Sequence, residues 1–219
     1  LINGESLKNL SELCKEHNIV LIHISTDYVF SSNFNQPIIR TSETEPINVY
    51  GNSKLLGEQL ITQSGCNYII IRTSWLYSKQ QNNFVRKMAD SIYLEKSLKI
   101  VYDQIGSPTS AKDLANFIYE IIINNNIKKY GIYHFCDKGV ASWYDVTMAI
   151  KNYFIEKGLI SNDYDDVSPC LSVEFKSNVK RPSYSVMDTR LTEEKFDFKI
   201  PYWTDSLRKV LDEITADIS

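Results

Sequence analysis

Tyr50 and Lys54, a tyrosine and a lysine four positions apart, are the residues whose types and spacing most clearly suggest chemistry. In a helix, such a pair lies on one face. A tyrosine hydroxyl ordinarily titrates near pH 10, and a neighbouring ammonium favours the phenolate and lowers that pKa. The pair could therefore deliver a proton to an alkoxide during carbonyl reduction. The same spacing also occurs by chance on exposed helices, so context has to decide between the two.

A hydroxyl lies upstream, at the end of an apolar run. Ser25 and Thr26 directly follow the run 19–24, which has the composition of a strand buried on both faces. Ligands of open α/β sheets bind outside the carboxyl ends of the strands, where a hydroxyl can polarise a substrate carbonyl. Thr26 is the expected contact, because Ser25 would point to the opposite side. An ordinary strand-end cap is the alternative interpretation of Thr26.

The elements that must position these residues alternate between helical and strand-like apolar periods. Helices are expected at about 7–14, 49–62, 83–94, 111–123 and 142–154, and strands at 19–24, 68–71, 98–101 and 131–135. This alternation predicts an α/β fold with a mostly parallel sheet. After about residue 158 the segments become short and irregular, and the chain ends in an amphipathic helix. We therefore expect the remainder of a Rossmann-type domain over 1–157, with excursions into the substrate lobe, and mainly the small substrate-binding lobe and the C-terminal helix over 158–219.

The glycine pattern limits this expectation. The eight glycines are dispersed, and none forms the G-x-G-x-x-G turn that opens a dinucleotide-binding fold and holds the pyrophosphate. The chain also begins with Leu1 rather than Met. The expected fold class is thus α/β, an incomplete doubly wound Rossmann-type parallel sheet with a small C-terminal substrate-binding lobe. We expect the 219-residue chain by itself to bind a dinucleotide poorly and to be inactive.

Composition argues against several functions. The chain is 43% hydrophobic and 23% charged with a formal net charge of -3, so it has no basic surplus for nucleic acid or for an acidic membrane surface. No apolar run approaches the roughly 20 residues that span a bilayer. The four cysteines are scattered without a C-x-x-C pair, which predicts no metal site and favours reduced thiols in a cytoplasmic protein.

Further blocks carry a family resemblance. S-T-D-Y-V-F at 25–30 and E-x-x-P-x-N-x-Y-G-x-S-K-x-x-G-E at 43–58 resemble the extended short-chain dehydrogenases. Three more blocks narrow the resemblance to the dTDP-4-dehydrorhamnose reductase family: R-T-S-W-L-Y at 72–77 followed by N-N-F-V at 82–85, D-Q-I-G-S-P-T at 103–109, and G-I-Y-H-F at 131–135 with S-W-Y at 142–144. Near the end of the chain, R-P followed by S-V-M-D-T within 181–189 resembles a further block of that family. The resemblance covers nearly the whole chain, with its blocks in the family order.

The resemblance implies roles for the residues near the Tyr–Lys pair. Tyr50 would be the proton donor, and Lys54 would lower its pKa and bind the nicotinamide ribose. Ile24 stands where relatives often carry a tyrosine, so it would touch the nicotinamide only through apolar contact. Thr26 and Asp27 would contact the sugar.

Four more residues become candidates for binding the substrate by the same resemblance. Trp75 would line the sugar or base pocket, although a core tryptophan is the alternative. Asn83 and Gln104 are weaker candidates. Arg181 could pair with the diphosphate through its planar guanidinium, although an ordinary surface arginine is an equal alternative.

The activity that the resemblance implies is reduction of the 4-keto group of dTDP-4-dehydro-6-deoxy-L-mannose to dTDP-L-rhamnose, with NADPH or NADH as the cofactor. A cytoplasmic enzyme that serves polysaccharide synthesis, and a homodimer, are further expectations. Two alternatives stay open: a non-catalytic regulatory subunit that binds a partner enzyme, and a related nucleotide-sugar reductase or epimerase. The presence of Thr26, Tyr50 and Lys54 together favours an enzyme.

Overall fold

The structure, a computed structural model, describes residues 2–31, 33–80, 83–175 and 179–216. The described helices are α1 (Ser6–Glu16), α2 (Val49–Ser64), α3 (Phe84–Tyr93), α4 (Ala111–Ile123), α5 (Trp143–Glu156), α6 (Arg190–Phe196) and α7 (Trp203–Thr215), with short 3-10 turns at Asp27–Val29, Asn126–Lys128 and Ser172–Glu174. The described strands are β1 (Leu21–Thr26), β2 (Tyr68–Thr73), β3 (Leu76–Tyr77), β4 (Leu98–Val101), β5 (Ile105–Gly106), β6 (Thr109–Ser110), β7 (Gly131–His134), β8 (Ala141–Ser142) and β9 (Val167–Cys170).

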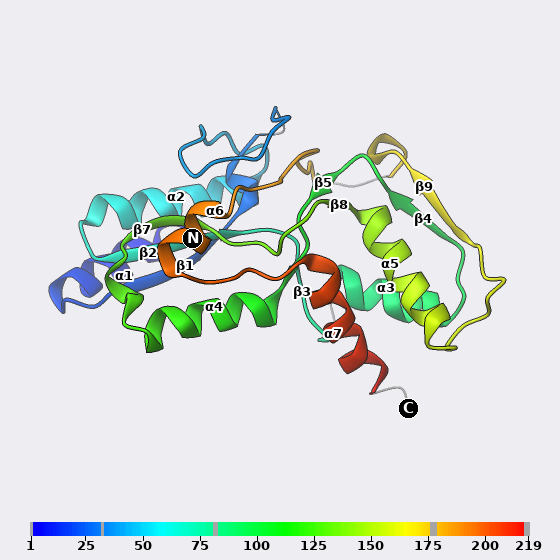
Figure 1. Cartoon of the computed structure of the whole chain (residues 1–219). Helices are drawn as coiled ribbons and strands as arrows, with labels where there is room; N and C mark the ends of the chain where they lie inside the picture. The colour runs from blue at the N-terminus through cyan, green and yellow to red at the C-terminus, as the bar shows by residue number, and fades with distance from the viewer. Residues whose placement is uncertain (1, 32, 81–82, 176–178, 217–219) are drawn as a thin grey trace.

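The main sheet has the order β1-β2-β7, and all of its strands are parallel. Its central strand is covered on both faces, as an uninterrupted apolar run predicts. Ile70 packs with apolar residues of α1 and α2, whereas Ile69 and Ile71 pack with residues of α4. Figure 1 follows this arrangement, with α4 running along the side of the sheet away from α2. The expected α/β fold with a parallel sheet is confirmed.

A second apolar core lies beside the sheet, in the part of Figure 1 that holds α3, α5, β4 and β9. The amphipathic helix α7 contributes Leu207, Val210, Leu211 and Ile214 to it. The expected strand at 98–101 forms at those residues, but it pairs in parallel with β9 in a separate two-stranded sheet. Residues from both sides of position 157 therefore share this core, and the division of the chain at that position stays a prediction.

The first strand begins two residues later than expected, at Leu21. The cause is the end of α1, where Asn18 takes a left-handed φ of 52° and the amide of Ile19 bonds the carbonyl of Cys14. These bonds hold residues 18 and 19 in the helix ending rather than in the strand. As a result Thr26 is the last residue of β1 itself, paired in register with Thr73 of β2.

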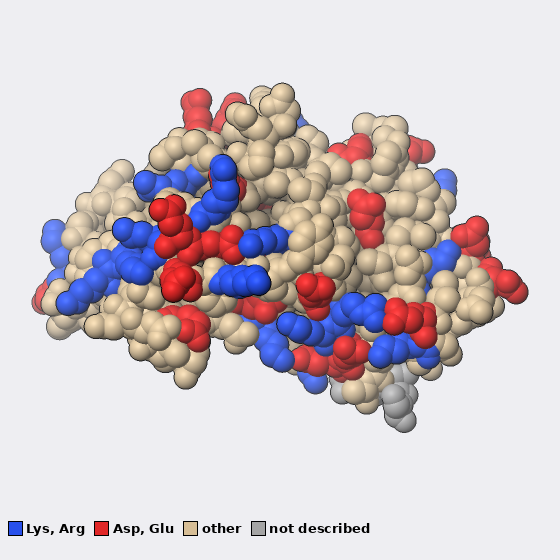
Figure 2. All heavy atoms as spheres, in the orientation of Figure 1, with Lys and Arg blue, Asp and Glu red and all other residues tan. Residues whose placement is uncertain are grey.

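Two general features complete the fold. No helix in the described part of the chain is long and apolar enough to cross a bilayer. On the face drawn in Figure 2, basic and acidic side chains are interspersed, so this face carries no extended patch of one sign. That distribution agrees with the small net charge of -3.

Candidate active site

The N-terminal turn of α2 brings Tyr50 to the carboxyl end of β1. Asn48 caps the helix by accepting a hydrogen bond from the amide of Gly51 at 2.8 Å. Gly51 sits so close to the next segment that a Cβ there would lie 2.1 Å from the carbonyl oxygen of Tyr28. Only glycine permits this approach, which places the Tyr50 phenol in hydrogen-bonding range of the Thr26 hydroxyl.

Tyr50 is held as a neutral phenol. Partial burial raises its pKa, the Thr26 hydroxyl opposes that shift, and the nearby Asp27 carboxylate adds to it. Desolvation by burial is the largest influence on this pKa, and the expected lowering of it by Lys54 stays a prediction. The ring of Tyr28 packs edge-on against that of Tyr50, with centroids 5.7 Å apart. Tyr50 keeps 45% of its surface exposed, so a ligand can still reach it.

Lys54 connects α2 to the same strand. Its ammonium donates a hydrogen bond to the carbonyl oxygen of Ile24 at 3.0 Å. Burial lowers the pKa of Lys54, and the negative charge of Glu58 partly offsets this. Tyr50, Lys54 and Glu58 follow one another at intervals of four residues, so they share one face of the helix.

Asp27 is the most deeply buried acid beside the phenol, with 2% of its surface exposed. The Thr26 hydroxyl donates to its Oδ1 at 3.0 Å. Burial raises the pKa of Asp27 to about 6, and the hydroxyls of Thr26 and Ser185 oppose the shift. Its Oδ2 nevertheless makes no hydrogen bond of good geometry. Such a buried oxygen is costly to leave unpaired, so it is suited to accept a hydrogen bond from a ligand hydroxyl.

Trp75 lies two residues beyond the end of β2. It has a left-handed φ of 47°, and its ring stacks on Trp143 with centroids 3.6 Å apart and planes 7° from parallel. Gly106 lies against this stack, because a Cβ there would come within 2.6 Å of the Trp75 ring. The Trp143 indole donates to the side-chain oxygen of Gln104 at 3.1 Å. Trp75 is thus held in place by the Trp143 ring and by Gly106.

A cleft of about 920 Å³ opens beside this tryptophan stack. Its walls combine apolar and aromatic side chains with several cations and one amide: Phe84, Met88, Leu98, Ile100, Val101, Trp143, Val173, Phe175, Val179, Lys87, Lys99, Lys180, Arg181 and Gln104, together with Ser172. Apolar walls with a few convergent polar groups are typical of small-molecule sites. The cations make this cleft suitable for an anionic ligand that also has an apolar or aromatic part.

Asn83 does not line the cleft among the residues that the structure describes. Its side-chain oxygen accepts from the amide of Arg86, which caps α3, and its side-chain nitrogen donates to the carbonyls of Ser78 and Gln80. The structure thus gives Asn83 a local capping role, and the expected contact with substrate stays a prediction.

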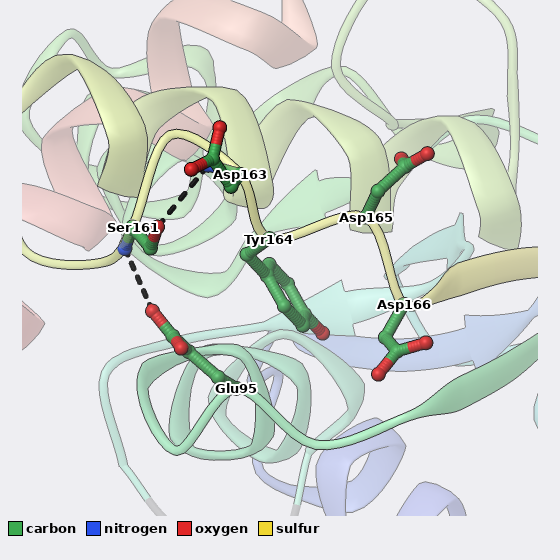
Figure 3. Close-up of a pocket in the computed structure, with 6 residues that line it drawn as sticks. All are labelled: Glu95, Ser161, Asp163, Tyr164, Asp165 and Asp166. Atoms are coloured by element: carbon green, nitrogen blue, oxygen red, sulfur yellow. Dashed lines mark hydrogen bonds between the residues drawn. The ribbon is translucent and has the colours of Figure 1, made fainter.

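A second cavity, of about 460 Å³, has the opposite charge (Figure 3). Its lining consists of acids around a serine and a tyrosine: Glu95, Asp163, Asp165, Asp166, Ser161 and Tyr164. The amide of Ser161 donates to Glu95 at 2.7 Å, and Asp165 pairs with Lys151 at 3.0 Å. Nowhere in the described ranges do three His, Cys, Asp or Glu residues gather as metal ligands.

Comparison with known proteins settles which family carries this arrangement. The family described as the RmlD substrate binding domain matches residues 1–216. A relative from Aggregatibacter actinomycetemcomitans, named dTDP-4-dehydrorhamnose reductase, is 32% identical over 212 residues, which cover 95% of this chain and 72% of the relative. The chain belongs to the dTDP-4-dehydrorhamnose reductase family. The resemblance noted in the sequence is therefore confirmed.

Two further relatives sharpen this assignment. A protein of Streptomyces niveus named dTDP-4-keto-6-deoxy-D-glucose reductase is 33% identical over 223 residues, covering 100% of this chain and 73% of its own length. A crystal structure of the dTDP-4-dehydrorhamnose reductase of Bacillus anthracis in complex with NADP superposes with a TM-score of 0.83 at 32% identity. That match covers 96% of this chain and 72% of the other. The Rossmann-like fold class is thereby confirmed.

Within this reductase family scaffold, the expected site residues fall into two groups. Thr26, Asp27, Tyr50, Lys54 and Ile24 meet at the end of β1. The second group is the cleft, where Gln104 and Arg181 lie in the lining and Trp75 stacks on the lining residue Trp143.

Sequence reasoning missed three groups that support the centre. Glu58 and Arg72 form a buried ion pair below Lys54, and Ser185 reaches Asp27 from a segment far along the chain. The continued spacing of four from Lys54 to Glu58 could have pointed to that acid. Nothing local in the sequence places Arg72 or Ser185 beside it, because both arrive through long-range folding.

Proposed function

We propose that the full-length protein reduces the 4-keto group of dTDP-4-dehydro-6-deoxy-L-mannose to dTDP-L-rhamnose with NADPH or NADH. The observation that carries this proposal is the meeting of Tyr50, Thr26 and Lys54 at the end of β1, on a chain of the dTDP-4-dehydrorhamnose reductase family. The NADP bound by the Bacillus anthracis relative supports the choice of cofactor class.

The residues at this centre suit a reduced nicotinamide and a sugar ketone. Tyr50 is partly exposed, and Lys54 reaches the strand end beside Ile24, so a ligand can lie against all of them. The nicotinamide, when bound, supplies the hydride. Tyr50, held protonated by burial, donates its proton to the developing alkoxide. Lys54 then stabilises the resulting tyrosinate, and the hydroxyl of Thr26 holds the carbonyl oxygen.

The cleft beside the tryptophan stack is the proposed seat of the nucleotide. A thymine base suits the apolar and aromatic walls, and the diphosphate suits the cations, of which Arg181 can offer a planar, two-pronged contact. Asp27, with an unpaired Oδ2, is proposed to hold a sugar hydroxyl. These two contacts would fix the sugar ring between the cleft and Tyr50.

A second candidate function differs from the first in the sugar that is reduced. The Streptomyces niveus relative carries the name of a reductase for a dTDP-linked keto sugar of the gluco series. The side chains at the centre suit either epimer, because Tyr50 and Thr26 address only the carbonyl. A non-catalytic subunit is disfavoured, since such a role would not require Thr26, Tyr50 and Lys54 to meet.

The deciding experiment follows NADPH and NADH oxidation by the full-length protein with each of the two dTDP-linked keto sugars. Turnover with dTDP-4-dehydro-6-deoxy-L-mannose is expected, and turnover with neither sugar would reject the proposal. Tyr50→Phe should lower kcat by about 1000-fold, because general acid catalysis contributes roughly 10²–10⁴. Tyr119→Phe is the matched control, since this tyrosine is 59% exposed on α4 and away from the centre. Wild-type turnover in Tyr50→Phe would remove the proton-donor role.

The cellular compartment and the oligomeric state of the protein are also proposals. The four cysteines are free and buried, which supports residence in the reducing cytoplasm. We further propose a homodimer, which light scattering coupled to size-exclusion chromatography would test directly. A single mass near 25.3 kDa for this chain would contradict it.

A further inference from the structure

The buried ion pair between Glu58 of α2 and Arg72 of β2 lies directly below the candidate active site. The Arg72 side chain donates to both carboxylate oxygens of Glu58, at 3.0, 3.2 and 2.6 Å. Both side chains are almost completely enclosed, with 3% and 4% of their surfaces exposed. A pair this deep rarely adds net stability, because removing two charges from water costs more than their attraction returns. Its presence therefore calls for another explanation.

The position of Glu58 on its helix suggests that explanation. Glu58 stands one turn beyond Lys54 on the same face of α2, and its negative charge acts on the Lys54 ammonium. It does not capture that ammonium, which bonds the carbonyl of Ile24 at 3.0 Å instead. Arg72 occupies both oxygens of Glu58, and this leaves Lys54 directed toward the strand end.

Arg72 is itself fixed from several sides. Its third nitrogen donates to the carbonyl of Arg40 at 3.2 Å, and its guanidinium lies 4.9 Å from the centre of the Phe30 ring. His134, its neighbour on β7, is buried, and its pKa is lowered to about 3. That histidine is neutral at physiological pH, so it adds no second positive charge beside Arg72, and Glu58 is the anion that pairs with Arg72.

The other titratable group beside Lys54 cannot replace Glu58. His23, on β1, faces Lys54 and Glu58, and burial together with the Lys54 charge lowers the pKa of His23 to about 4. It is thus neutral above pH 5, so it adds no positive charge beside Lys54 and, as an imidazole, cannot act as an anion. Tyr50, from the same helix, is protonated. Glu58 is therefore the acid that favours the charged form of Lys54 among the described neighbours.

We propose that Glu58, clamped by Arg72, is a positioning residue that keeps Lys54 charged and directed at the end of β1. This inference rests on the proposed function, because it assigns the pair to the Tyr50–Lys54 centre. Its consequence is that removal of the carboxylate shifts the ionisation of Lys54 to lower pH even when the fold is retained. A purely structural ion pair would leave that ionisation unchanged.

The test uses a charge-free replacement that keeps the interior neutral. In the full-length protein, the double variant Glu58→Gln/Arg72→Met removes both charges together, which buried pairs often tolerate. Lysine labelled with ¹³C at Cε reports the Lys54 titration by NMR, and the Lys54→Arg variant assigns its signal. We expect the Lys54 midpoint of the double variant to move to lower pH. The alkaline limb of kcat should move with it, because the activity depends on the charged form of Lys54.

Two matched variants separate charge from stability. Glu58→Asp keeps the carboxylate but shortens the pair, so it should lower Tm while the Lys54 midpoint stays near that of the wild type. The exposed pair Glu156–Arg208 provides the control, because Glu156→Gln/Arg208→Met removes the same charges at a distance from Lys54. It should change neither the midpoint nor the alkaline limb.

The titration and the turnover assay give separate answers about the positioning role and about the proposed function. A folded double variant with an unshifted Lys54 midpoint overturns the positioning role, as does a midpoint that follows Tm in Glu58→Asp. If the double variant does not fold, the variant Glu58→Gln/Arg72→Gln, which also leaves no unpaired charge, is titrated with the same criterion. The NMR titration needs no turnover, so an inactive wild-type protein would reject the reductase proposal and leave the titration to decide this one.

Discussion

The polar centre at the end of β1 and the cleft beside the tryptophan stack differ in whether their charged groups are buried or exposed. At the centre, Thr26 and Asp27 are buried, one carboxylate oxygen lacks a good partner, and burial shifts the pKa values of Asp27, Tyr50 and Lys54. In the cleft, Lys180 and Arg181 are exposed and meet apolar walls. We therefore propose that the centre moves a proton and that the cleft holds an anion.

The difference shows how one chain separates chemistry from recognition. Desolvation strengthens the electrostatic interactions of the centre, so a single group there should control the rate. The exposed cations of the cleft are screened by solvent, so each should contribute modestly to affinity. The acidic cavity of Figure 3 provides a third environment, in which negative charge opposes binding of a nucleotide.

The strongest test of this comparison removes the ammonium from the centre. Lys54→Met should lower kcat by about 100-fold, because the tyrosinate formed in the reaction loses its neighbouring cation. The cofactor dissociation constant should rise as well. Steady-state kinetics and fluorescence titration with NADPH measure both effects. Lys112→Met, at a lysine on the surface of α4 whose side chain is 67% exposed, is the control. An active Lys54→Met variant would place the chemistry elsewhere.

A smaller effect should appear in the stability of the centre with pH. The folded protein raises the pKa of Asp27 from 3.8 to about 6, so it binds a proton more tightly than the unfolded chain does. Its stabilising contribution is therefore complete below about pH 4 and is lost as pH rises through 6. The loss is on the order of 3 kcal/mol.

Asp27→Asn removes this pH dependence. Compared with the wild type, the variant should gain stability between pH 4 and pH 7, as measured by urea unfolding at several pH values. Asp166→Asn, at an exposed acid of the second cavity, should show no such gain. Parallel stability curves for Asp27→Asn and the wild type would mean that Asp27 is not desolvated in the native state.

The cleft should respond in affinity rather than in rate. Arg181→Ala should raise KM for the dTDP-sugar about tenfold, equivalent to roughly 1.4 kcal/mol, and leave kcat nearly unchanged. Arg181→Lys should restore only part of the affinity, because a lysine has no planar fork. Initial-rate kinetics over a range of substrate concentrations separate the two constants. A loss confined to kcat would move Arg181 from the cleft to the reacting atoms.

The smallest effect is expected in the acidic cavity. Asp163→Asn should leave KM and kcat within about twofold of the wild type, since a surface charge distant from the site is largely screened. Steady-state kinetics at low and physiological salt would check this. A clear fall in KM would show that the acidic cavity repels the substrate from a distance, and would weaken the contrast between the two cavities.

Much of the fold followed from local pattern. The helix starting at Val49 and the helix over 111–123 begin where the apolar spacing predicts, and Ser142 forms the expected cap, with Asp145 completing a capping box. The partner of the strand at 98–101 did not follow, because an apolar run predicts that a strand forms but not which strand it joins. Pairing with β9 depends on the path of the intervening residues 102–166.

The sequence by itself determined the chemical inventory of this protein: a phenol and an ammonium one helical turn apart, and a hydroxyl after an apolar run. Side chains four residues apart in a helix, or two residues apart in a strand, lie on the same face. Such features can therefore be predicted from a short stretch of sequence. Only the tertiary structure decided that burial raises the pKa of Tyr50, that Arg72 clamps Glu58 below Lys54, and that the cleft forms beside the stacked tryptophans. Desolvation and ion pairing depend on what surrounds a group, and those surroundings come from distant parts of the chain.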